Sequence, residues 1–479
     1  MPIQINDLWD EIDKKYVGFS PNTTSIKPVH IANGLFRTSL NYISDTKSLN
    51  RFVFWQKADG NIPPGHELEA VFRALEGQNR IDNTTVSMES LKHLRVLMKK
   101  ILNADDGVYT HGMDSYSGGY MGFLSKDYVG QSGGELIALW LRSIRSPLLD
   151  TIINSINEPS DIITALCYPL LESADVSHNS AFDIEDIKFL NMTLPPAPNK
   201  IWNGLAKAAE TLNKHIKAHP NKLQRLRLAI LFACFVLNRH LTSLESYYVP
   251  GAEGKVQPLL LDFSENSSDP VSKASTMTYT YSCQSISRFY TWAFSERLMQ
   301  DFSKEDLLRE GTPTYQGNTT NETNELWSLT IEEARSSDYP YVVCGQAIYD
   351  ILALQAKGDP IRYFRQLGIR SGLMWPPIQP GKRFAAQQDM LEMLIRASVE
   401  PGSVMDLNTL QDELWNRFGI VIGGRSLDDE RLIAAGVYQA DSSALRTNRD
   451  RFASRLNSLD FAKLLADGVL QIELEVINA

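Results

Sequence analysis

Two carboxylates near the middle of the chain could do chemistry by their type and spacing. Asp262 and Glu265 lie at the end of the apolar run Val256–Phe263, which holds three consecutive leucines and is the best strand candidate. Strand-end carboxylates can hold a divalent cation, as in metal-dependent nucleases. However, no lysine follows at the D/E-x-K spacing on a next strand, and a strand-ending aspartate usually forms a turn. We therefore expect no metal site and keep a metal-dependent nuclease subunit as an alternative.

The remaining catalytic patterns are weak or absent. His111, Asp114 and Tyr116 could form a small polar site in the Gly- and Tyr-rich stretch 107–134, but a long loop of this composition contains such residues anyway. Gly254-Lys255 lacks the upstream glycine and the following Ser or Thr of a phosphate-binding loop. All eight histidines lie at or before His240, so the second half of the chain has no imidazole base, and the HExxH zinc motif is absent. We assign no catalytic residue and expect no cofactor.

Four arginines near the carboxyl end suggest phosphate binding. They lie in the predicted helix Ser443–Leu459, beside the single acid Asp450, and are Arg446, Arg449, Arg451 and Arg455. In a helix that enters the major groove, these side chains could contact phosphates while Asn448 reaches a base edge. The alternative is a solvated helix face whose arginines pair with nearby acids such as Asp428, Asp429, Glu430 or Asp441.

The segment 360–388 is a second candidate for nucleic-acid binding, because it carries five cations and no carboxylate. The cations are Arg362, Arg365, Arg370, Lys382 and Arg383. Four aromatic residues are interleaved with them: Tyr363, Phe364, Trp375 and Phe384. Cations next to aromatic rings suit a nucleic-acid backbone with stacked bases. The alternative is an interdomain linker whose aromatic side chains belong to a core and whose arginines are solvated.

Composition describes a folded protein with an acidic surface. The chain has 479 residues, 43% hydrophobic and 22% charged, and a net charge of -10 from 47 basic and 57 acidic residues. Disorder of the bulk is excluded, and any nucleic-acid contact must be a local patch, because nonspecific coating of nucleic acid requires phosphate neutralisation.

The same composition predicts a cytoplasmic protein without a membrane anchor. The cysteines Cys167, Cys234, Cys283 and Cys344 lack the close spacing of a zinc or redox motif, which fits a reduced compartment. The start of the chain has no signal-peptide pattern. The most apolar stretch, Leu228–Leu237, reaches about half of a bilayer core, so we expect a buried helix.

Two proline clusters predict three domains, since proline interrupts both helices and central strands. The clusters lie at Leu194–Asn199 and Trp375–Gly381. We expect an N-terminal helical domain with the Gly/Tyr-rich loop at 1–194, a central helical domain with a short strand at 199–374, and a third domain at 384–479. Apolar periodicity predicts helices at His66–Leu75, Met88–Leu102, Glu135–Ile144, Ile201–Ile216, Leu223–Leu241, Tyr279–Leu298 and Val342–Leu354.

The last hundred residues follow the element order of a winged helix. We expect helices at Phe384–Ala397, from an Asp406 N-cap to Gly419, and at Ser443–Leu459, with an extended segment 420–424 between the last two. The alternation in Val469–Glu475 predicts a half-buried strand. The predicted fold is therefore mainly α, a multi-domain helical protein with minor β structure and a C-terminal winged-helix-like module.

The C-terminal stretch resembles the winged-helix tails of accessory, non-ATPase proteins of bacterial anti-phage defence islands. The resemblance rests on Leu414-Trp415-Asn416-Arg417-Phe418-Gly419-Ile420-Val421-Ile422-Gly423, followed by Asn448, Leu456, Leu459, Leu464 and Asp467-Gly468. Arg225–Leu241 followed by Leu259–Phe263 is similar to the same group. The resemblance implies an accessory subunit encoded beside ATPases, helicases or nucleases, and it carries over no catalytic residue.

Taken together, the residues and the resemblance predict a non-catalytic scaffold or adaptor subunit of a bacterial defence or DNA-processing complex. Its helical body would dock other protein subunits, for example an ATPase, helicase or nuclease, and a basic patch would contact DNA. A nuclease subunit using Asp262 and Glu265, or a pure protein–protein scaffold, are the alternatives.

Overall fold

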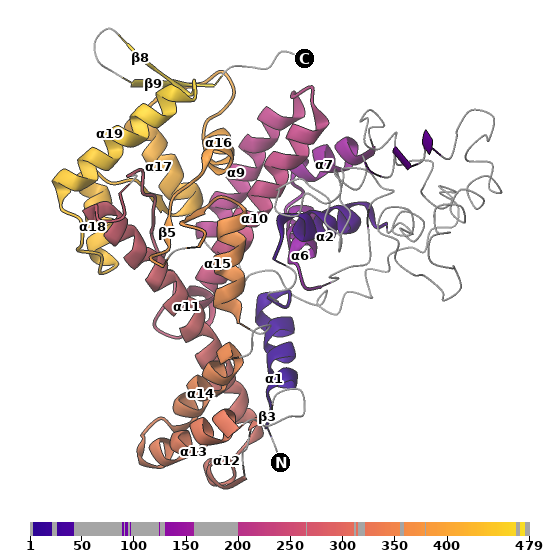
Figure 1. Ribbon diagram of the computed structural model, residues 1–479, viewed down its shortest axis with the longest axis vertical. Coiled ribbons are helices and arrows are strands. Elements are labelled where there is room, and N and C mark those ends of the chain that lie inside the picture. The colour runs from indigo at the N-terminus through magenta and orange to yellow at the C-terminus, as the bar shows by residue number, and fades with distance from the viewer. Residues whose placement is uncertain are drawn as a thin grey trace. The chain divides into compact units, whose positions relative to one another are not determined.

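The computed structural model describes residues 3–21, 26–42, 130–157, 200–264, 266–310, 313–314, 321–354, 359–378, 380–465 and 470–474, with a few single residues between 89 and 124. This part is mainly helical with short strands, as the sequence predicts (Figure 1). Several predictions lie wholly or largely outside the described residues: the helices His66–Leu75 and Met88–Leu102, the loop 107–129 with His111, Asp114 and Tyr116, the proline cluster at 194–199, and Glu265.

Contacts divide the chain into two compact units. The smaller unit comprises residues 27–187 and 216–233, and the larger comprises 1–26, 188–215 and 234–478. The segments 199–374 and 384–479, which the sequence predicts as separate domains, lie largely in the larger unit and are joined there by strand pairing. The three-domain division stays a prediction.

In the smaller unit, helix α2 (Pro28–Leu40) packs against α6 (Gly134–Ser143), and α7 (Pro147–Asn157) lies beside both. A Cβ added at Gly134 would lie 2.1 Å from the backbone oxygen of Ile31, so only glycine permits this close crossing. Arg37 and Glu135 form a fully buried ion pair across it. The helix predicted at Glu135–Ile144 is confirmed as α6.

Helix α10 (Lys222–Tyr248) contributes its first turns to the smaller unit and its remainder to the larger. It covers the predicted helix Leu223–Leu241 and continues beyond it. Among the described helices it is the one long and apolar enough to cross a membrane, yet 94% of its apolar window is buried inside the protein. Such burial is typical of a core helix.

The larger unit is built around α11 (Pro270–Asp301), a helix about 48 Å long at 1.5 Å per residue. Its sequence is rich in Ser and Thr, and several of these hydroxyls donate to the carbonyl four residues earlier, for example Ser282 to Thr278. This satisfies polar side chains that would otherwise be buried without partners. Packed against α11 are α1 (Ile5–Ile12), α14 (Pro340–Leu354) and α15 (Pro360–Arg370), and α13 (Asn321–Ser336) packs on α14. A π-helical turn at Asp13–Val17, α9 (Lys200–Lys217) and α12 (Lys304–Glu310) are further elements of the chain.

Short strands tie distant segments of the larger unit together. Strand β1 (Ile3–Gln4) pairs in parallel with β3 (Pro313–Thr314), and β4 (Met374–Trp375) pairs antiparallel with β5 (Arg383–Phe384). From the predicted strand Val256–Phe263, two residues form β2 (Leu259–Leu260), which pairs in parallel with β7 (Ile420–Val421). The pairing is short because β7 stops at the glycines that follow Ile422.

The C-terminal segment contains α16 (Gln388–Arg396), β6 (Val404–Asp406), α17 (Leu407–Phe418), α18 (Ser426–Ala434), α19 (Ser442–Ser458), β8 (Ala462–Leu464) and β9 (Leu470–Glu473). The strands β6, β9 and β8 form an antiparallel sheet in that order. Both predicted helix signals of α17 are confirmed: Asp406 Oδ1 accepts from the Thr409 amide at 2.8 Å, and Gly419 ends the helix with a φ of 67°. The sequence did not predict α18, β6 or β8.

Candidate nucleic-acid interface

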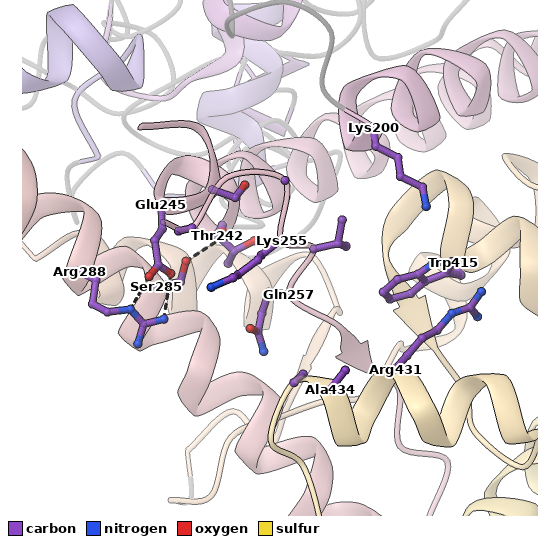
Figure 2. Close-up of a pocket in the computed structure, with 15 residues that line it drawn as sticks. Lys200, Thr242, Glu245, Lys255, Gln257, Ser285, Arg288, Trp415, Arg431 and Ala434 are labelled. Carbon is purple, nitrogen blue, oxygen red and sulfur yellow. Dashed lines mark hydrogen bonds and ion pairs between the residues drawn. The ribbon is translucent and has the colours of Figure 1, made fainter. Parts of the chain in front are cut away.

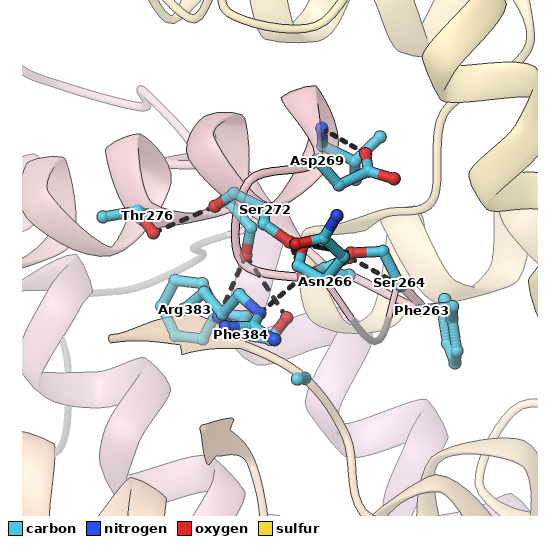
Figure 3. Close-up of polar contacts among 12 residues, drawn as sticks. Phe263, Ser264, Asn266, Asp269, Ser272, Thr276, Arg383 and Phe384 are labelled. Atoms are coloured by element: carbon cyan, nitrogen blue, oxygen red, sulfur yellow. Dashed lines mark hydrogen bonds and ion pairs between the residues drawn. The ribbon is translucent and has the colours of Figure 1, made fainter. Parts of the chain in front are cut away.

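The β2–α11 loop (residues 261–269) brings the two predicted basic regions to one place. Helix α19 contacts the loop from one side through Asn448, and β5 contacts it through Arg383. Figure 3 shows Ser264, Ser272 and Arg383 gathered at this loop. Arg383 and Asn448 are 65 residues apart in sequence, so their meeting at this loop depends on the tertiary fold.

Asp262 is an interior residue of this loop, only 3% exposed. Its Oδ1 accepts from the Ser264 amide at 2.8 Å, and its Oδ2 accepts from the Ser272 hydroxyl at 2.6 Å. Arg383 completes the set with an ion pair to Oδ2. Both carboxylate oxygens therefore already have protein partners, and the described residues contain no cluster of three or more His, Cys, Asp or Glu that could hold a metal ion.

Asn448 is fully buried, which corrects the interpretation that it could reach a base edge. Its Nδ2 donates to the carbonyls of Leu261 and Ile422, both at 2.9 Å, and its Oδ1 accepts from the Phe263 amide at 2.9 Å. The side chain thus satisfies three backbone groups at the ends of β2 and β7. It holds α19 against the β2–β7 pair and faces away from solvent.

The four arginines of α19 differ in how they are held. Arg451 forms an ion pair with Asp269 at 2.8 Å. Arg449 donates to the side-chain oxygens of Gln411 and Asn408 at 3.0 and 2.8 Å, so its partners are neutral amides. Arg446 and Arg455 are exposed, and neither forms an ion pair within the described part of the chain.

The helical repeat separates these arginines into two rows. Leu445, Phe452 and Leu456 define the buried side of α19. At roughly 100° per residue, Arg446 and Arg449 fall on one flank of the helix, and Arg451 and Arg455 fall on the other. Between the two rows runs an exposed line of short polar residues, Ser443, Thr447, Asp450 and Ser454. We call this surface the α19 face.

The cations of the segment 360–388 are less available than the sequence predicts. Arg383 is buried in its ion pair with Asp262 and cannot reach a ligand backbone. Arg362, Arg365 and Arg370 lie on α15 and are half-buried, as is Lys382. Desolvation, followed by the nearby charge of Arg365, lowers the pKa of Lys382.

Three of the four aromatic residues proposed for base stacking belong to the core. Tyr363, Phe364 and Phe384 are at most 1% exposed. Phe364 and Phe384 pack edge to face and both contact Tyr279 of α11. For these three, the alternative core interpretation holds. Trp375 is different, because 43% of its surface is exposed.

Trp375 borders a hollow of about 610 Å³ beside the β2–α11 loop, which we call the Trp375 pocket. Among the described residues, its lining includes Lys273 and Arg383 and no carboxylate: Ser267, Ser272, Lys273, Thr276, Met277, Trp375, Pro376, Pro380, Gly381, Arg383 and Gln439. Lys273 is exposed on the first turn of α11 and lies outside both predicted patches. Sequence reasoning could not identify Lys273, because it is a lone lysine in a Ser/Thr-rich helix and only the tertiary structure places it beside Trp375.

The smaller unit contains one motif that is typical of serine hydrolases. Gly130-Gln131-Ser132-Gly133-Gly134 fits the GxSxG pattern of serine hydrolases and precedes α6. A nucleophile elbow must expose its serine, whereas Ser132 is fully buried and its hydroxyl donates to Glu135 Oε2 at 3.3 Å. Ser132 also accepts from the Gly134 amide at 3.3 Å, so this serine acts as a local support for the helix start.

No protein-family description, curated protein or solved structure matches this chain.

Proposed function

We propose that the protein is a non-catalytic subunit that binds nucleic acid through the α19 face, within a bacterial defence or DNA-processing complex. The observation that carries the proposal is the two rows of arginines flanking the exposed line of short polar residues on α19. A duplex offers phosphates on both sides of the major groove and base edges between them. Flanking guanidinium groups with small side chains between them match that order.

The topology around α19 supports the same proposal. The C-terminal segment contains helices α16, α17 and α19 and an antiparallel sheet in the order β6-β9-β8. We propose that they form a winged helix with α18 inserted before its third helix. In that fold the third helix enters the major groove. We therefore propose α19 as the recognition helix and the paired strands β8 and β9 as part of the wing.

The exposed line on α19 also suggests how bases are read. Thr447 is a hydroxyl-bearing residue at the centre of the line, and Asp450 is its one carboxylate. A carboxylate repels phosphates but can accept a hydrogen bond from the amino group of cytosine. Asp450 would then lower nonspecific affinity and favour particular bases.

The direct test measures binding of a labelled 25-base-pair duplex by fluorescence anisotropy across a salt series. Arg446→Ala/Arg455→Ala should weaken binding about tenfold or more, and the slope of log K against log salt should fall by about 1.8 for two lost phosphate contacts. Lys304→Ala/Arg335→Ala removes the same charge from the exposed surfaces of α12 and α13 and is the matched control. Asp450→Ala should tighten nonspecific binding.

Equal loss in both double variants would show that only net charge matters and would sink the α19 proposal. Absence of binding at low salt would favour the second candidate, a pure protein–protein scaffold. A specific observation favours that candidate: three apolar side chains on α18 and just after it are 48 to 70% exposed, namely Leu427, Ile433 and Tyr438. Association with partner subunits through this patch is compatible with nucleic-acid binding through α19.

A further inference from the structure

A second hollow, with lining residues different from those of the Trp375 pocket, has the chemistry of a ligand site. It measures about 660 Å³ and lies between the end of α10, the connection from α10 to β2, α11, α17 and α18. Trp415 of α17 and Arg431 of α18 border it together with Lys255 of the connection (Figure 2). We call it the Trp415 pocket, and its volume falls within the usual range for small-molecule sites.

Positive charge dominates the Trp415 pocket. Four cations line it, Lys200, Lys255, Arg288 and Arg431, against one carboxylate, Glu245. Glu245 is already bound by Arg288 through two hydrogen bonds of 2.5 and 2.9 Å. Lys200 and Lys255 are exposed, and within the described residues neither forms an ion pair. Two positive charges therefore lie at the rim, in a protein whose net charge is -10. Hydrogen bonds to the backbone amides of Glu253 and Gly251 lower the pKa of the exposed Glu253 carboxylate, and the nearby charge of Lys255 contributes to this lowering.

A buried arginine beneath the pocket lining adds to the positive electrostatic potential of the pocket. Arg239 of α10 is 1% exposed, and its Nε and Nη1 have no hydrogen-bond acceptor among the described residues. A Cβ added at Gly419 would lie 2.4 Å from Arg239 Nη2 and 3.1 Å from Val256 Cγ1. Because Val256 lines the pocket, the Arg239 guanidinium lies just beneath the pocket lining. Burial lowers the pKa of Arg239 to about 10, which still leaves it charged at neutral pH.

The pocket also offers an aromatic surface whose orientation is fixed. The guanidinium of Arg431 lies over the Trp415 ring, 4.5 Å from its centroid, and is itself held by Asp428 at 2.8 Å. A planar cation and an indole ring held in place form a platform for another flat π-system. Figure 2 shows the Lys200 side chain directed toward Trp415 from α9.

One polar group in the pocket lacks a partner in the described structure. Gln257 Nε2 is buried and has no acceptor among the described residues. The hydroxyls beside it donate elsewhere: Thr242 to the Arg239 carbonyl, Ser285 to the Thr242 carbonyl and Ser246 to the Ser243 carbonyl. A buried amide donor without an acceptor is costly, and a ligand acceptor in the pocket would relieve that cost.

We propose that the Trp415 pocket binds a nucleoside phosphate. Lys200 and Lys255 hold the phosphates, the base lies against the Trp415–Arg431 platform, and Gln257 donates to a ring nitrogen or carbonyl of the base. The site is separate from the α19 face and does not depend on the proposed function. The proposal concerns binding of the nucleotide as an effector and includes no hydrolytic step.

The test is isothermal titration calorimetry of the full-length protein with ATP, adenosine and inorganic triphosphate at low salt. We expect ATP to bind more tightly than either fragment, because each fragment engages half of the site. Lys200→Ala/Lys255→Ala should weaken ATP binding about tenfold or more, since each lysine provides a charge-assisted contact to phosphate. It should leave the weak binding of adenosine unchanged. Trp415→Phe, which keeps an apolar ring in the partly buried position, should weaken ATP and adenosine but not triphosphate.

Two control variants test whether ATP binds at this site. Lys304→Ala/Arg335→Ala removes two exposed cations far from the pocket lining and should leave ATP binding unchanged. Arg446→Ala/Arg455→Ala should also leave it unchanged, and a loss of ATP binding in that variant would place the nucleotide on the α19 face and overturn this site. The proposal is equally overturned if ATP does not bind at millimolar concentration, or if triphosphate binds as tightly as ATP and Trp415→Phe has no effect.

Discussion

Arg383 and Asp262 form a buried ion pair that connects the β4–β5 hairpin to the β2–α11 loop. From the sequence, Arg383 was a candidate nucleic-acid contact and Asp262 a candidate metal ligand. In the structure the two side chains form an ion pair with each other. Two charges that were candidates for separate functions thus hold the interior of the larger unit. A nucleic-acid interface must therefore use other side chains, such as the exposed arginines of α19.

Breaking that pair should destabilise the protein strongly. Asp262→Ala leaves the guanidinium of Arg383 buried without its counter-charge, and we expect a loss of about 3–5 kcal/mol in the free energy of unfolding. Arg451→Ala breaks the more exposed pair with Asp269 and should cost about 1 kcal/mol or less. Urea denaturation followed by circular dichroism measures both. Similar losses in the two variants would contradict the interior role of Asp262.

Asn448 should behave as a structural residue in the same assay. Asn448→Ala removes three hydrogen bonds to buried backbone groups, so we expect a loss of about 3 kcal/mol or more. Asn457→Ala, at an exposed position of the same helix, should change stability by less than about 0.5 kcal/mol. If Asn448→Ala left stability intact but changed base preference, the base-reading interpretation would be restored.

Trp375 and Lys273 should extend the nucleic-acid interface beyond α19. Trp375→Ala should weaken binding of a single-stranded oligonucleotide by about tenfold, which is the size of one base–aromatic stacking contact. Lys273→Ala should lower the salt slope by about 0.7. Tyr339→Ala, which removes another exposed aromatic side chain, is the control. The same anisotropy titration reports all three, and an unchanged affinity in Trp375→Ala would remove the Trp375 pocket from the interface.

His240 should make stability depend on pH. Burial lowers its pKa from 6.5 to about 4, while its Nε2 donates to the Val17 carbonyl at 2.7 Å. Between these two pH values the unfolded chain binds the proton and the folded chain does not, so stability falls as the pH falls from about 6.5 to about 4. This difference in the pKa of His240 between the unfolded and folded states corresponds to about 3 kcal/mol in the free energy of unfolding.

The matched variant for this prediction is His240→Gln, which keeps a hydrogen-bond donor but has no charge to gain. Asp13 is also buried and has a raised pKa, chiefly through desolvation, so the wild-type curve contains more than one contribution. The difference between wild type and His240→Gln isolates the histidine. A constant difference across pH 4 to 7 in urea denaturation would refute the assignment.

Several elements were readable from sequence because their signals are local. Apolar side chains recur at helical spacing over Ile201–Ile216, and they form α9. Asp406 and Gly419 begin and end α17 as predicted, because a cap bonds to backbone groups within a turn of itself.

Only the tertiary structure decided which polar residues face inward. Asn448 and Arg455 lie on one predicted helix, and periodicity cannot say that the first satisfies the ends of β2 and β7 while the second stays in solvent. Likewise, the two residues of β2 pair with β7, about 160 positions later in the chain. Helix α18 was not predicted because its apolar residues do not form a clear stripe. Burial of a polar group depends on partners distant in sequence, and local patterns do not contain that information.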